Sequence, residues 1–144
     1  GDQSKAPPES LELSARLASC GLELLKVKAW TEAEPFLREA LAIREAKAPD
    51  AWPTFNTRSM LGGALLGQGQ LAEAEPLLLG GYTGMKEREA SIPATGTARI
   101  HEALERLVRL YEAKSDEPQA AAWRSKLEAA QSLQAKPAGK EDCK

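Results

Sequence analysis

The sequence predicts an all-α protein built from repeated helix pairs, and three observations lead to this prediction. First, residues 30–41 return as residues 71–82 with Glu, Ala, Glu and Pro matched at a fixed offset, and a period of this size is typical of repeat architectures. Second, the chain is rich in Ala, Leu and Glu, which favour helices. Third, no window alternates apolar and polar residues for long enough to indicate a strand.

The first pair follows a polar lead-in, residues 1–8, which contains two prolines and is predicted to be disordered. A helix is predicted over residues 9–27, because apolar or small residues recur there at helical spacing. These residues are Leu17, Cys20, Gly21 and Leu24. The second helix is predicted over residues 30–47, where Thr31 and Glu34 have the spacing of a capping box.

The second pair begins at Asp50, which is predicted to cap a third helix over residues 51–68. Pro53 is tolerated in the first turn of that helix, where a missing N–H costs little. Gly69 suits the end of the helix, because glycine readily adopts the backbone conformation that closes a helix. A fourth helix is predicted over residues 71–90, in spite of three internal glycines, since its last residues still favour helix.

The third pair follows a loop at residues 91–96. Helices are predicted over residues 97–114 and 117–133, and the tail at residues 134–144 is predicted to be flexible because it mixes charges and contains proline and glycine. The apolar positions are Ile100, Leu104, Leu107, Val108 and Tyr111 in the fifth helix and Ala120, Trp123 and Leu127 in the sixth.

These elements predict one repeat domain over residues 9–133, composed of three helix-turn-helix pairs. The pairs cover residues 9–47, 50–90 and 95–133. Each pair has too little apolar surface to fold alone, and stacking the pairs buries a shared core. The predicted molecule is therefore a stack of pairs rather than a single globular bundle.

Composition and charge argue against several functions. The net charge is −2 and no long run of Lys or Arg occurs, so the sequence has no basic footprint for nucleic acid. No apolar stretch approaches the roughly 20 residues that span a membrane. Cys20 and Cys143 predict neither a disulfide framework nor a metal site, and no cofactor is expected. Because the sequence begins with Gly1 rather than Met, we expect a processed or truncated chain, and the compartment stays open.

Small residues recur where the two helices of a pair would touch, and larger apolar residues recur between them. The small positions are Gly21, Gly62, Ala33, Ala74, Ala120, Ala40 and Gly81, and the large ones are Leu24, Leu65 and Tyr111. This pattern resembles tetratricopeptide (TPR) repeats, and the long period resembles the kinesin-light-chain-like subgroup. Residues 49–127 also resemble the TPR segments attached to bacterial serine/threonine kinases. The resemblance implies a right-handed α-α superhelix, that is, an α-solenoid. Val108 departs from the pattern at a small position, so the third pair is expected to splay.

In TPR stacks the first helix of each pair lines a concave surface, so the resemblance implies a partner-binding groove on these helices. The groove is expected to be apolar at the first pair and highly charged at the third. The implied partner-binding residues are Leu22, Asn56, Ser59, Gly63, Leu66, Glu102, Arg106 and Arg109. Of the Lys, Asn and Arg set with which TPR domains clamp a terminal carboxylate, only Arg106 is matched.

Two groups of groove residues have alternative interpretations. Gly63 and Gly67 share a helix face, where missing side chains allow either a ligand backbone or a neighbouring helix to approach closely. Arg106 and Arg109 are suited to grip a carboxylate or phosphate. The sequence favours the alternative that both arginines pair within their own helix, with acids three or four residues away. Those acids are Glu102, Glu105 and Glu112.

The sequence offers little for catalysis. His101 is the only histidine, and it is expected to lie on the surface without a catalytic partner. No serine lies in a nucleophile-elbow context and no glycine run resembles a phosphate loop. We therefore expect that the chain is not an enzyme.

The expected function is a non-catalytic protein–protein interaction module that binds a peptide or a partner domain in its groove. The alternative is a structural or self-association segment of a larger multidomain protein, such as a bacterial kinase. In that alternative Trp123 and Leu127, at an uncapped end, contact either a second copy, which gives a homodimer, or a further domain of the larger protein. Neither expectation specifies the identity of the partner.

Overall fold

The computed structural model describes the backbone of residues 10–141 and the side chains of residues 10–133. Within this part of the chain six α-helices and two short 3-10 helices form, and no strand is present, which confirms the all-α prediction. The bounds are α1 Leu11–Lys26, α2 Trp30–Lys47, α3 Trp52–Gly67, α4 Leu71–Glu87, η1 Glu89–Ser91, η2 Ala94–Gly96, α5 Ala98–Ala113 and α6 Glu117–Glu141.

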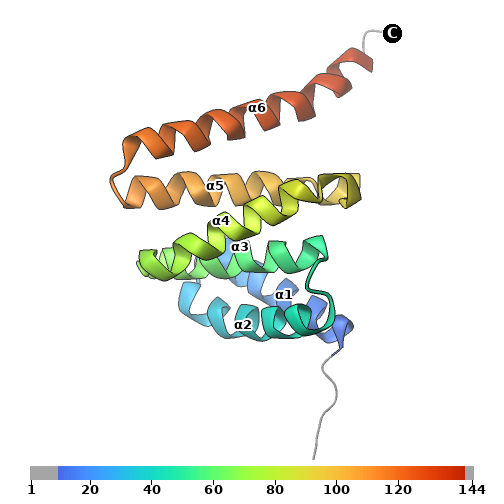
Figure 1. Ribbon diagram of the computed structural model, residues 1–144, viewed down its shortest axis with the longest axis vertical. Coiled ribbons are helices and arrows are strands. Elements are labelled where there is room, and N and C mark those ends of the chain that lie inside the picture. Colours follow the sequence, from blue (N-terminus) through green and yellow to red (C-terminus); the bar gives the residue numbers. More distant parts are fainter. Residues whose placement is uncertain (1–9, 142–144) are drawn as a thin grey trace, which may run out of the picture.

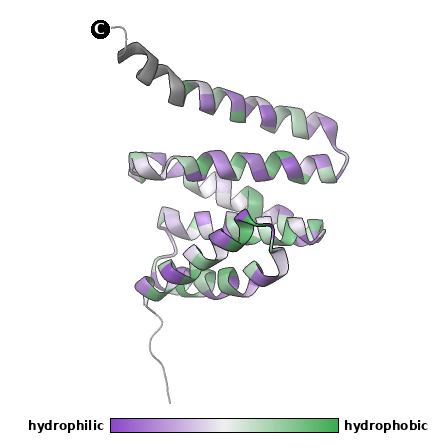
Figure 2. Cartoon of the chain, turned by 180° about the vertical axis from the view of Figure 1, so that it is seen from behind, coloured by the Kyte–Doolittle hydropathy of each residue, from purple (hydrophilic) through white to green (hydrophobic). Residues whose placement is uncertain are grey.

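The helices follow one another along the long axis of the molecule, from α1 and α2 at one end to α6 at the other (Figure 1). Each helix packs on its neighbours in the chain, and α3 also contacts both α1 and α5. Hydrophilic and hydrophobic residues are interspersed along the helices, as Figure 2 shows for α5 and the described part of α6. The helices are amphipathic, and their apolar faces contribute to a core that is shared between successive pairs.

The turn between the two helices of each pair has the same backbone geometry. Lys28, Gly69 and Ser115 occupy equivalent positions and have φ angles of 62°, 81° and 58°. The amide of the next residue then bonds to a carbonyl five residues back, from Ala29 to Leu24 at 2.9 Å and from Gln70 to Leu65 at 2.9 Å. The third pair repeats this closure, so the turn is a feature of the repeat, although only one pair has glycine there.

Close packing within the first two pairs depends on glycines of the first helix. A side chain at Gly21 would overlap the side chain of Leu37, and a Cβ at Gly62 would lie 2.7 Å from Cγ of Leu78. The third pair has Val108 at the equivalent position, where it is buried. The third pair was expected to splay at this position, and α6 does leave α5 at an angle in Figure 1.

The repeated acids connect one pair to the next. Glu34 accepts a 2.9 Å hydrogen bond from Gln68, and Glu75 accepts a 2.7 Å bond from Lys114. Gln68 and Lys114 lie at the same position of successive turns. Glu75 also accepts a 2.7 Å bond from the hydroxyl of Tyr111. The bonds from Lys114 and then Tyr111 lower the pKa of Glu75 below its ordinary value. These acids therefore fix the spacing between pairs, a role that the sequence analysis missed.

Two predicted helix caps were wrong. The second helix begins at Trp30 after Ala29, with no side-chain cap, so Thr31 and Glu34 do not form the predicted capping box. Ala51 stands at the N-cap of α3, again without a side-chain bond, in place of the predicted Asp50. The N-cap is two residues before Thr31 in α2 and one residue after Asp50 in α3. Among these three helices only α1 has a side-chain cap, in which the hydroxyl of Ser10 accepts a 3.0 Å hydrogen bond from the amide of Leu13.

Other boundaries also differ from the predictions. The fourth helix ends at Glu87, and η1 and η2 fill most of the predicted loop. The last helix continues past residue 133 to Glu141, although the sequence predicted a flexible tail from residue 134. Cys20 is exposed instead of lying on the buried stripe of α1. The predicted disordered lead-in and Cys143 lie outside the described residues.

Candidate functional site

Three helices that open successive pairs, α1, α3 and α5, frame a groove with two adjoining hollows. One hollow has a volume of about 240 Å³ and the other about 260 Å³. In both, α1 and α5 contribute opposite walls and α3 lies between them, while Leu22 lines both hollows. We call this surface the α1–α3–α5 groove. The first helices of the pairs thus line one surface, as the sequence analysis predicted.

The first hollow contains Arg106 and is called the Arg106 hollow. It is lined by Leu22, Leu25, Lys26, Lys28, Trp30, Gly63, Glu102, Glu105, Arg106 and Arg109. The side chain of Arg106 is only 6% exposed and donates a 2.9 Å hydrogen bond to the hydroxyl of Ser59. A Cβ at Gly63 would lie 3.0 Å from Nε of Arg106, so this glycine makes room for the arginine. Burial lowers the pKa of Arg106 to about 10.

The predicted ion pairs of Arg106 within its own helix are absent from the described part of the chain. Glu102 pairs with Arg99 instead, at 3.0 Å, and Glu112 pairs with Arg124 at 2.9 Å. The interpretation of Arg106 as part of a solvated, mixed-charge helix face was therefore wrong. A buried guanidinium with one neutral acceptor retains unused hydrogen-bonding capacity.

The second hollow contains Asn56 and is called the Asn56 hollow. It is lined by Ala15, Ala18, Ser19, Leu22, Arg44, Trp52, Pro53, Asn56, Met60 and Arg99. The guanidinium of Arg44 donates hydrogen bonds to the hydroxyls of Ser14 at 3.1 Å and Thr57 at 2.7 Å. Burial lowers its pKa, and no carboxylate lies among the residues of this hollow.

Arg44 and Arg99 were not predicted as groove residues, and the first end of the groove was expected to be apolar. That expectation was wrong, because Arg44 reaches the Asn56 hollow from α2, outside the helices assigned to the groove. Arg99 had a signal in the sequence, since it precedes Arg106 by seven residues and so lies on the same helix face. Nothing local indicated Arg44.

Three buried side-chain atoms have no hydrogen-bond partner among the described residues, and all three belong to the groove. They are Oδ1 of Asn56, Nε of Arg99 and Oε1 of Glu102. Buried polar atoms in folded proteins are nearly always paired, so each such atom requires an explanation. Two of these atoms are acceptors and one is a donor. A ligand with both N–H and C=O groups satisfies such a set.

The structure brings most of the predicted partner-binding residues together. Leu22, Gly63, Glu102, Arg106 and Arg109 line the Arg106 hollow, and Asn56 lines the other hollow. The remaining two serve the interior: Ser59 is fully buried beneath Arg106, and Leu66 is half-buried against the main core.

The two groove glycines accommodate side chains of the protein itself. Gly63 leaves space for Arg106, and a side chain at Gly67 would overlap the indole ring of Trp30. The packing alternative therefore applies to both glycines, although the neighbours are side chains rather than a helix backbone. Both neighbours, Trp30 and Arg106, line the same hollow.

The charge of the groove is opposite to that of the chain. Six cationic side chains and two carboxylates line the two hollows, whereas the net charge of the chain is −2. The cations are Lys26, Lys28, Arg44, Arg99, Arg106 and Arg109, and the carboxylates are Glu102 and Glu105. A local cationic surface is thus present although the overall composition gives no sign of it.

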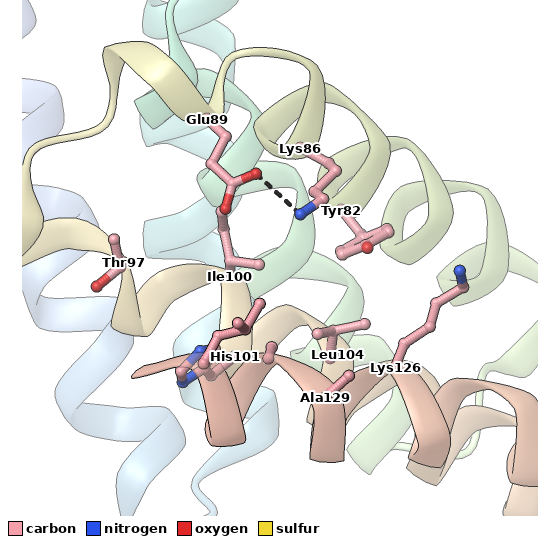
Figure 3. A pocket seen from close by; sticks show the side chains of 11 residues that line it. Tyr82, Lys86, Glu89, Thr97, Ile100, His101, Leu104, Lys126 and Ala129 are labelled. Carbon is pink, nitrogen blue, oxygen red and sulfur yellow. Dashed lines mark hydrogen bonds and ion pairs between the residues drawn. The ribbon is translucent and has the colours of Figure 1, made fainter. Parts of the chain in front are cut away.

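A third hollow, of about 470 Å³, opens where α6 diverges from α5 and faces α4 (Figure 3). Its charged groups include Lys86, which is paired with Glu89 at 2.8 Å, and Lys126. His101, expected on the surface, is half-buried and lines this hollow (Figure 3). This hollow follows from the splayed third pair, and none of its lining residues has an unpartnered buried atom.

Two further observations concern the residues that the structure describes. No group of three His, Cys, Asp or Glu side chains in them is arranged to hold a metal ion. No helix among them is both long enough and apolar enough to cross a membrane. Comparison of the sequence with protein-family models and with curated proteins gives no match.

Proposed function

We propose that this chain is a TPR-like α-solenoid, a right-handed superhelix of three helix pairs. The support comes from features that recur at equivalent positions. The turns share a left-handed residue and the same closing hydrogen bond. The first helix of two pairs carries a glycine under a leucine of the second helix. Ala33, Ala74 and Ala120 are fully buried at the small position that the TPR resemblance assigns to the second helix.

The function we propose is a non-catalytic protein–protein interaction module that binds a peptide or a partner domain in the α1–α3–α5 groove. One observation carries this proposal: the three unpartnered buried polar atoms of the described side chains all lie on residues that line the groove. A peptide backbone offers N–H donors and C=O acceptors along its length and so matches donors and acceptors together. Binding in the micromolar range is expected for a short peptide on a surface of this size.

The alternative function is self-association, for which Trp123 and Leu127 are the expected contact residues. Trp123 packs edge-to-face on Tyr82, with ring centroids 5.3 Å apart at 83°, and Leu127 packs against the second core cluster. Both residues are half-buried against this chain and so offer a second copy only part of their apolar surface. Attachment to a bacterial kinase stays a prediction from the resemblance.

The proposal is tested by selecting peptides against the protein from a random library and mapping their contacts by amide chemical shifts. Residues of the groove on α1, α3 and α5 are expected to shift. Ser19→Trp fills the Asn56 hollow from an exposed position and should weaken binding at least about tenfold. Ser125→Trp, at an exposed position of α6 outside both hollows, is the matched control. Peptides that bind elsewhere, or equal binding by both variants, contradict the proposal.

A further inference from the structure

We propose that the groove selects an extended acidic peptide with two carboxylate side chains three residues apart, one entering each hollow. This inference rests on the proposed peptide-binding function and specifies the chemistry of the partner. It is carried by the charge of the groove, by Arg44 and Arg106, which have no carboxylate partner among the described residues, and by the spacing of the two hollows along α3.

The first step concerns the Arg106 hollow. Arg106 is buried, its only hydrogen bond goes to the neutral hydroxyl of Ser59, and it forms no ion pair with a described carboxylate. Removing a charge from water is unfavourable unless an opposite charge and further hydrogen bonds compensate. Lys26, Lys28 and Arg109 around the same hollow add positive charge. A carboxylate from outside is the group that completes the site, since a guanidinium binds carboxylates through two parallel bonds.

The second step concerns the Asn56 hollow. Arg44 and Arg99 line it together with no carboxylate. Arg44 bonds only to neutral oxygens. Arg99 pairs through Nη2 with Glu102 of the other hollow at 3.0 Å, but its Nε is buried without an acceptor. This hollow therefore also favours an anion, and its available donor belongs to Arg99.

The third step concerns spacing. Asn56 marks one hollow and Gly63 the other, and they are seven residues apart on α3. Seven residues of helix span about 10 Å. An extended polyproline-type peptide rises about 3.1 Å per residue and presents every third side chain on one face. Side chains three residues apart thus lie about 9 Å apart on the same face, which matches the separation of the two hollows.

The fourth step distinguishes a peptide from a nucleic acid. Oδ1 of Asn56 and Oε1 of Glu102 are buried acceptors that need donors. Backbone amides of an extended peptide supply such donors, whereas the phosphodiester backbone of a nucleic acid has none. Glu102 and Glu105 also stand beside the cations of the Arg106 hollow and repel a continuous line of phosphates. An acidic peptide places negative charge only where the arginines lie.

The experiment uses the whole chain and its own tryptophans. Trp30 lines the Arg106 hollow and Trp52 the Asn56 hollow, so intrinsic fluorescence reports on both. The probe is a synthetic peptide with two glutamates separated by two alanines, which keep their backbone N–H groups. It is compared with a peptide that has glutamine at both positions and with one whose glutamates are adjacent. We expect the first peptide to bind at least about tenfold more tightly than either comparison peptide.

Protein variants test the two arginines separately. Arg106→Gln and Arg99→Gln are each expected to weaken binding of the acidic peptide about tenfold. Binding of the glutamine peptide is expected to stay unchanged. Arg124→Gln removes one positive charge from α6, outside both hollows, and is expected to bind as the parent protein does. Arg99 is half-buried, so its variant tests the inference even if the change at buried Arg106 affects folding.

Each contrary outcome has a distinct meaning. Equal binding of acidic and glutamine peptides overturns the inference and leaves the proposed peptide-binding function standing. Tighter binding of a short single-stranded oligonucleotide than of the acidic peptide overturns the choice of a peptide. If selected neutral peptides also fail to perturb the groove, the proposed function fails with the inference.

Discussion

The guanidinium of Arg106 on α5 donates a 2.9 Å hydrogen bond to the hydroxyl of Ser59 on α3, and both side chains are buried. The space for the arginine exists because Gly63 has no side chain. A hydroxyl satisfies one donor but does not neutralise the charge. Arg106 is therefore placed at a cost to stability, which is typical of positions kept for binding rather than for folding.

The first prediction follows from this relationship. Arg106→Met keeps the apolar stem and removes the buried charge, so the free energy of unfolding should stay unchanged or rise by up to about 2 kcal/mol. Ser59→Ala leaves the guanidinium without its acceptor and should lower the free energy of unfolding by about 1–3 kcal/mol. Urea denaturation of both variants measures these changes. A loss above about 2 kcal/mol in Arg106→Met, comparable with the loss of a core side chain, would show that the arginine supports the fold.

The second prediction compares two glycines within the second pair. Gly62→Ala places a Cβ 2.7 Å from Leu78 and should destabilise the protein by about 1–3 kcal/mol. Gly80→Ala adds a methyl group where no atom lies within 4 Å, and it should stabilise α4 by about 0.5–1 kcal/mol. Thermal unfolding of the two variants is the measurement. If both variants shift the midpoint of unfolding in the same direction, the close contact between α3 and α4 is not the reason that residue 62 is a glycine.

The third prediction concerns the repeated turn. Ser115 has a φ of 58° and Lys28 a φ of 62°, a conformation that costs L-residues about 1 kcal/mol relative to glycine. Replacing either residue by glycine removes this cost, but glycine also increases the entropy of the unfolded chain. The net effect of Ser115→Gly and of Lys28→Gly should be a rise of about 0.5 kcal/mol in the free energy of unfolding. Gly69→Ala is the reverse control and should be destabilising. A stabilised Gly69→Ala would contradict this account of the turn.

The fourth prediction is the pH dependence of the bond network at Glu75. Its pKa is lowered by the bonds from Lys114 and then Tyr111, so the carboxylate stabilises the fold above its ordinary pKa of 4.5. This contribution is lost as the pH falls through the lower pKa of the folded state. Glu75→Gln should therefore cost about 1 kcal/mol at pH 7 and much less near pH 3. Glu128→Gln, at an exposed position of α6, should show no such difference.

The same hydrogen-bond network also makes the stability of the fold depend on pH in the alkaline range. Burial, with a further contribution from Glu75, raises the pKa of Tyr111 to about 12 from an ordinary value of 10.0. The neutral phenol thus contributes stability that is complete below pH 10 and decreases as the pH rises towards 12. Tyr111→Phe should be less stable than the parent protein at pH 8, and the difference should narrow above pH 10. A difference that stays constant across this range would mean that the hydroxyl does not titrate with folding.

The groove shows where sequence reasoning succeeds and where it fails. Asn56, Gly63 and Arg106 were assigned to it correctly, because residues on one face of the first helices must share a surface. The environment of Arg106 was misjudged. Acids three and four residues away are visible in the sequence, but the space beside Gly63 on another helix is not.

The sequence by itself determined the helix pairs, their period and the small positions where helices touch, since these depend on local propensity and on residues at fixed offsets. Only the tertiary structure decided which charges meet. Arg44 from α2 and Arg99 from α5 line the same hollow. Glu75 of the second pair accepts a hydrogen bond from Lys114 of the third pair. Such contacts depend on how successive pairs pack, and burial and the resulting hydrogen bonds then set the electrostatics of each group.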